Sequence, residues 1–112
     1  MRKVAILLIL LALVKVVYAH PPVKIEISFD RENNLLTAKI IHPVEDPKTH
    51  YINNVDISIN SKEILKHEIS RQDNENEQVV IYRLPDVKES DTIGVEGYCS
   101  ISGVKEEDFK IE

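Results

Sequence analysis

Two histidines, His42 and His50, flank a short loop that contains Pro43 and Pro47. Proline restricts the backbone, so such a loop has a defined shape, and an alternating strand pattern begins directly after His50. Imidazoles held at the mouth of a rigid sheet are a common way to mount a metal ion. The question is then which other residues could supply the remaining ligands.

Three further residues carry side chains that could join such a site. His20 precedes the first predicted strand, His67 lies within a charged strand, and Cys99 ends the sixth predicted strand. A thiolate beside imidazoles suits iron, zinc or copper, depending on the number and geometry of the ligands. Cys99 is the single cysteine of the chain. Its alternatives are a small buried apolar residue or an intermolecular disulfide.

Short strands must position these residues, because apolar and polar side chains alternate along the chain and no helical repeat follows residue 19. The alternation places Val23, Ile25, Ile27 and Phe29 on one face of the first strand. Strands are predicted at residues 23–29, 35–41, 51–59, 63–69, 79–84, 92–99 and 104–111. We predict an all-β fold, an immunoglobulin-like antiparallel β-sandwich of about seven strands. Residues 70–78 are polar enough to predict a solvated loop that buries nothing.

The first two predicted strands are joined by a polar turn and are expected to form a hairpin. A hairpin places His20, at the start of one strand, beside His42, at the end of its antiparallel neighbour. If strand ends gather at one pole of the sandwich, His50 and Cys99 lie near them.

The N-terminus has the pattern of an export signal. A basic start is followed by an apolar run that ends in small residues at Ala19, so residues 1–19 are predicted to be a signal peptide. A membrane anchor is the alternative, although Lys15 interrupts the run. Residues 20–112 then form one extracytoplasmic domain, periplasmic or secreted. Loss of residues 1–19 changes the formal charge from −5 to −8, which argues against nucleic acid as a partner.

Four short motifs resemble the iron-site motifs of superoxide reductase, the domain found also in neelaredoxin and desulfoferrodoxin. They are H-P-P-V at 20–23, H-P at 42–43, H-Y-I at 50–52 and Y-C-S-I-S-G at 98–103. The resemblance covers nearly the whole predicted domain. It implies a mononuclear non-haem iron held by His20, His42, His50 and Cys99. It also implies the reduction of superoxide to hydrogen peroxide with electrons from an unidentified donor.

Three features depart from the family pattern. The family's fourth histidine corresponds to Ser102, the interval between His42 and His50 is longer, and Ala19 replaces the lysine before the first histidine. These departures leave open whether the chain is an enzyme. The alternative is a non-catalytic metal-binding, electron-transfer or interaction module on the same sandwich, with iron, zinc or copper, or without a metal.

Other assignments also stay open. Once exposed as an N-terminus, His20 could chelate a metal through its amine together with its imidazole. His67 is predicted to be a surface residue, although it, water or the Ser102 hydroxyl could fill the gap in the ligand set. Glu45 and Asp46 could approach a metal or simply solvate the loop. The sequence lacks the motifs of serine hydrolases, nucleotide-binding loops, dithiol oxidoreductases and zinc proteases.

Overall fold

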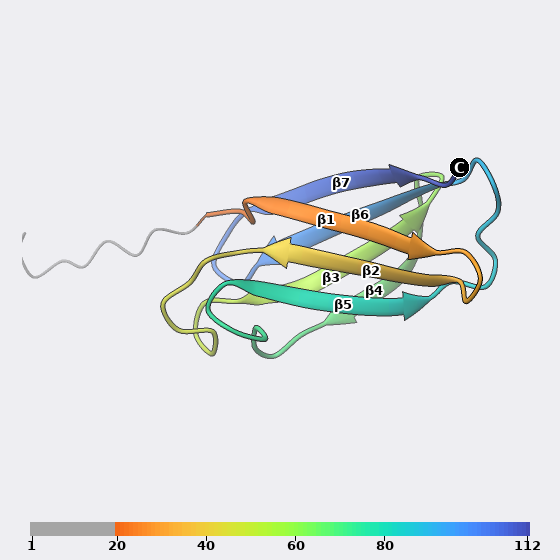
Figure 1. Cartoon of the computed structure of the whole chain (residues 1–112). Helices are drawn as coiled ribbons and strands as arrows, with labels where there is room; N and C mark the ends of the chain where they lie inside the picture. Colours follow the sequence, from red (N-terminus) through yellow and green to blue (C-terminus); the bar gives the residue numbers. More distant parts are fainter. Residues whose placement is uncertain (1–19) are drawn as a thin grey trace, which may run out of the picture.

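Seven antiparallel strands in two sheets form the part of the chain that the computed structural model describes, residues 20–112 (Figure 1). They are β1 (Lys24–Asp30), β2 (Leu35–Ile41), β3 (Ile52–Ile59), β4 (Lys62–Glu68), β5 (Glu77–Arg83), β6 (Thr92–Cys99) and β7 (Val104–Lys110). One sheet has the order β1-β2-β5 and the other β4-β3-β6-β7. The predicted immunoglobulin-like sandwich is confirmed, and each predicted strand begins and ends within two residues of an observed one.

The predicted signal peptide, residues 1–19, lies outside the described residues. Within residues 20–112, no helix is long and apolar enough to cross a membrane.

The core lies between the two sheets, and the alternation along each strand decides which side chains enter it. In β6, Ile93, Val95 and Cys99 are buried, whereas Glu96 and Tyr98 lie on the outer face, where the Tyr98 hydroxyl donates to Glu96. The buried apolar cluster comprises Ile25, Leu36, Ala38, Ile40, Ile52, Val55, Ile57, Val80, Leu84, Ile93, Val95 and Ile111. Each large aliphatic side chain in it contributes about 1.5–3 kcal/mol through burial.

Two details of the predicted pattern are wrong. Val23 is exposed, because it precedes β1 at the open end of the sandwich. The polar segment at residues 70–78 is not wholly solvated, because the side chains of Gln72 and Gln78 are buried. An amide can enter the interior when all of its hydrogen-bonding groups find partners there, and both glutamines meet that condition.

The strand directions bring four segments to one end of the sandwich (Figure 1). These are the start of the domain before β1, the β2–β3 connection, the β4–β5 connection and the β6–β7 turn. The β2–β3 and β4–β5 connections each lead from one sheet to the other. β1 and β2 form the predicted hairpin, with Lys24 opposite Ile41. This end carries the candidate ligands.

Candidate metal centre

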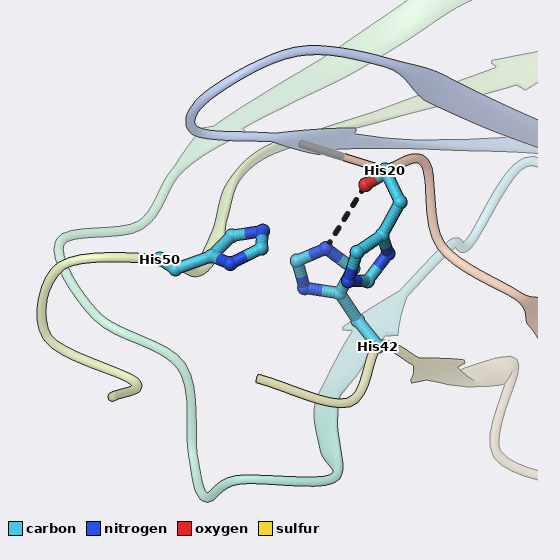
Figure 2. A group of neighbouring side chains, drawn as sticks. All are labelled: His20, His42 and His50. Atoms are coloured by element: carbon cyan, nitrogen blue, oxygen red, sulfur yellow. Dashed lines mark hydrogen bonds between the residues drawn. The ribbon is translucent and has the colours of Figure 1, made fainter. Parts of the chain in front are cut away.

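The imidazoles of His20, His42 and His50 meet at this end of the sandwich (Figure 2). The ring centroids are 4.8 Å apart for His20 and His42, 5.1 Å for His20 and His50, and 4.9 Å for His42 and His50. One ring nitrogen of each histidine lies within 4.8 Å of the other two. With metal bonds of about 2.1 Å, neighbouring nitrogens on one ion are about 3.0 Å apart at a right angle and about 3.6 Å apart in a trigonal arrangement, so the three rings would have to move closer together to bind one metal.

Cys99 lies beside this cluster because of the pairing between β3 and β6. Ile52 is directly opposite Cys99, and the pairing continues beyond it, since the Ser100 N–H donates to the Tyr51 carbonyl at 2.8 Å. The Ser100 hydroxyl accepts the Tyr51 N–H at 3.1 Å. His50, the next residue along, is thereby held against Cys99, with 3.2 Å between its Nε2 and the sulfur.

The distance between His50 Nε2 and Cys99 Sγ suits two ligands of one metal ion. Metal bonds of about 2.1 Å to nitrogen and about 2.3 Å to sulfur separate the two atoms by about 3.1 Å at a right angle and about 3.6 Å at the tetrahedral angle. The observed 3.2 Å falls in this range. Three imidazoles and one thiolate form a donor set that binds iron, zinc or copper. The residues present therefore fit a transition metal.

The loop between His42 and His50 is shaped by hydrogen bonds to its own backbone. The Asp46 carbonyl accepts the N–H of His50 at 3.0 Å, and the Asp46 carboxylate accepts the N–H of Lys48 at 2.9 Å. At the other end, the His42 N–H donates to the Asn76 carbonyl at 2.9 Å. Asp46 therefore turns the chain so that His50 points back toward His42.

The segment that carries His20 packs against the β6–β7 turn. A side chain on Gly103 would begin 2.8 Å from the Pro21 nitrogen, and Gly103 has a φ of 97°. Only glycine combines this close approach with this backbone conformation at low cost. The His20 Nδ1 donates to the Pro21 carbonyl at 3.0 Å, which leaves its Nε2 available as a ligand.

The buried environment favours neutral imidazoles, the form that binds metals. His42 is fully buried, and burial lowers its pKa despite the opposing effect of its bonds to Gln72 and the His20 carbonyl. Burial likewise lowers the pKa of His50, and the neighbouring rings of His42 and His20 add to the shift.

Several residues considered from the sequence lie outside the cluster. His67 is exposed on β4, and its Nδ1 is 2.7 Å from the Tyr82 hydroxyl on the edge of the other sheet. Ser102 is exposed in the β6–β7 turn. Among the described residues, the group whose ligand atoms all lie within 4.8 Å of one another consists of the three histidines; it contains no carboxylate and does not include Cys99, whose sulfur lies near His50. Glu45 and Asp46 therefore do not join the histidines, and Asp46 acts instead on the loop backbone.

Two residues that contact the site were not identified from the sequence. Gln72 is fully buried in an otherwise exposed loop, and its Oε1 lies 2.8 Å from His42 Nδ1. The Ser100 hydroxyl accepts a hydrogen bond from the Tyr51 N–H and so joins the end of β6 to the segment that carries His50. The only available signal was the position of Ser100 next to Cys99. Nothing in the run of polar residues around Gln72 distinguishes it from its neighbours.

No protein-family model matches the sequence, and no curated protein matches it. The fold, however, resembles solved superoxide reductases. The superoxide reductase from Giardia intestinalis is 18% identical, with a TM-score of 0.62 over 81% of this chain and 99% of that one. A superoxide reductase solved in the oxidized state is 16% identical, with a TM-score of 0.59 over 88% and 94%. The neelaredoxin from Ignicoccus hospitalis is 16% identical, with a TM-score of 0.51 over 83% and 80%. The described domain is therefore superoxide-reductase-like in its fold.

Proposed function

We propose that this chain is an exported superoxide-reductase-like domain that binds one iron ion through His20, His42, His50 and Cys99 and reduces superoxide to hydrogen peroxide. The observation that carries the proposal is the convergence of three imidazoles, with the Cys99 sulfur 3.2 Å from His50 Nε2, on a sandwich with the fold of superoxide reductases.

The protein's own residues would divide the work between anchoring and access. His42 and Cys99 are buried, so they would fix the ion from the interior side. His20 and His50 are only partly buried, so a small anion would approach the ion from their side. Iron held by these residues would pass one electron from an external donor to superoxide, and two protons from solvent would complete hydrogen peroxide.

The exposed position of Ser102 supports a second candidate function. With three nitrogens and one sulfur, the ligand set can close tetrahedrally around zinc, or bind copper for electron transfer, with no position for a substrate. In that case the domain would be a metal-binding or electron-transfer module without catalytic activity.

Export is part of the proposal and rests on the sequence pattern of residues 1–19. Cleavage after Ala19 would make His20 the first residue of the mature protein. N-terminal sequencing of the protein recovered from the extracytoplasmic fraction tests this. A mature chain that retains residues 1–19 in a membrane fraction would support an anchor instead.

Metal content and activity of anaerobically purified protein test the function. We expect one iron per chain, a visible thiolate-to-iron charge-transfer band after oxidation, and peroxide formation from superoxide with a chemical reductant. His42→Ala should lose the metal, whereas His67→Ala, which removes a histidine outside the cluster, should retain it. Zinc without superoxide consumption would favour the second candidate, and protein that binds no metal would exclude both.

A further inference from the structure

We propose that Gln72 is a positioning residue of the metal centre: its side-chain amide holds the His42 ring with the proton on Nδ1 and leaves the lone pair of Nε2 free to bind a metal. The consequence for metal binding rests on the proposed function. The protonation state of the ring does not, because it can be observed without metal.

The hydrogen bonds of Gln72 decide which way its amide points. Its Nε2 lies 2.7 Å from the His42 carbonyl and 3.0 Å from the Asn74 carbonyl, and carbonyl oxygens can only accept. The amide nitrogen must therefore face these two groups. The oxygen, Oε1, then faces the N–H of Ile52 at 3.2 Å and the Nδ1 of His42 at 2.8 Å. The reverse orientation would break the three contacts with the Ile52 N–H and the His42 and Asn74 carbonyls.

This orientation determines the tautomer of His42. An amide oxygen is an acceptor, so the Nδ1 of His42 must carry a proton and donate it. A neutral imidazole has one N–H, so Nε2 keeps its lone pair. Nε2 lies 3.3 Å from the His20 carbonyl oxygen (Figure 2), a longer contact than the 2.8 Å between Nδ1 and Gln72 Oε1, so Gln72 is the better-placed acceptor for the single ring proton.

The burial of Gln72 reflects this role. Its side chain is fully buried although most of its loop is exposed. It joins the β2–β3 connection, through His42, to the start of β3, through Ile52. Gln78 provides a matched comparison in the same part of the chain. It is also buried, at 6% exposure, but its amide bonds to Asp73 and Val79 and not to His42.

The experiment compares Gln72→Leu, Gln72→Glu and Gln78→Leu with the wild-type protein, each produced from the full-length chain. After removal of metal with a chelator, two-bond ¹H–¹⁵N correlation spectra assign the tautomer of each histidine. Titration with Co²⁺ then measures metal affinity. In wild type, His42 should be protonated on Nδ1. In Gln72→Leu the acceptor is gone, so the proton should move to Nε2, where the His20 carbonyl accepts it, and Co²⁺ affinity should fall about 10–100-fold.

The other two variants separate positioning from general stability. Gln72→Glu keeps an acceptor for Nδ1 but loses both donated bonds, so it should be less stable yet retain the Nδ1 proton. Gln78→Leu should also be less stable, with the His42 tautomer and Co²⁺ affinity unchanged. The proposal is overturned by an Nε2 proton in wild type, by an unchanged tautomer in Gln72→Leu, or by an equal loss of affinity in Gln78→Leu. If Gln72→Leu does not fold, the wild-type and Gln72→Glu spectra still decide it. Failure of every protein to bind Co²⁺ refutes the proposed function, while the tautomers still test the role of Gln72.

Discussion

Replacing Gly103 with alanine tests whether the β6–β7 turn holds His20 in place. Gly103 has a φ of 97°, in a region that side chains other than glycine rarely adopt. The new methyl carbon would lie 2.8 Å from the Pro21 nitrogen, 3.0 Å from its Cα and 3.1 Å from its Cβ. Two of the three atoms are backbone, so a side-chain rotation cannot relieve the collision. Either the turn or the segment that carries His20 must move.

The expected cost is the sum of two effects. A residue with a side chain at this φ costs about 1–2 kcal/mol, and forcing a methyl group into a packed contact costs about 1–3 kcal/mol. If the Pro21 segment stays in place, the metal-free protein should lose about 2–5 kcal/mol of its free energy of unfolding. If the Pro21 segment moves instead, the loss in free energy of unfolding should be about 2 kcal/mol. His20 should then leave the cluster.

Urea unfolding of the metal-free protein and titration with Co²⁺ measure both effects. Ser102→Ala is the matched control, because Ser102 is the exposed neighbour of Gly103 in the same turn. The control should match wild type in both measurements. If Gly103→Ala also matched wild type in stability and in Co²⁺ affinity, the reasoning that links this turn to His20 would be refuted.

Three further predictions concern the same end of the molecule. Cys99→Ser should still bind metal through the histidines but should lose the thiolate charge-transfer band; a band that survives means the sulfur is not a ligand. Ser100→Ala removes the acceptor of the Tyr51 N–H and should lower the free energy of unfolding by about 1 kcal/mol, as measured by the urea midpoint; no loss would show that this bond contributes nothing. Burial lowers the pKa of His42 and His50 below the ordinary 6.5 of the unfolded chain. The metal-free protein should therefore be most stable above that value and lose stability as the pH falls through the lowered folded-state pKa values. Urea midpoints that stay the same between pH about 7.5 and about 5 would contradict this prediction.

The sandwich could be predicted because its signal is local. Strand alternation has a period of two, so a run such as Ile93 to Cys99 shows by itself which side chains face the core. The polar turn between β1 and β2 likewise indicates the hairpin that brings His20 to His42. The types of the candidate ligands and their positions at strand ends were also readable from the sequence.

The contacts that complete the site could not be predicted in this way, because they join residues distant along the chain. The register that puts Cys99 opposite Ile52 decides that the sulfur meets His50 and is not simply buried in the core. Gln72 enters the interior only because a carbonyl, a ring nitrogen and a strand N–H from other segments are arranged to bond with its amide.

Sequence alone determined the fold class and the candidate ligands, since both depend on residue type and on spacing along one strand or turn. Tertiary structure decided which candidates meet. It separated His67 from the other three histidines by placing it on β4. It also brought Gln72, an uncharged residue of a polar loop, into the buried surroundings of His42. The physical reason is that the hydrogen bonds of a side chain in a loop depend on the donors and acceptors that neighbouring loops place around it. The local sequence pattern does not contain that information.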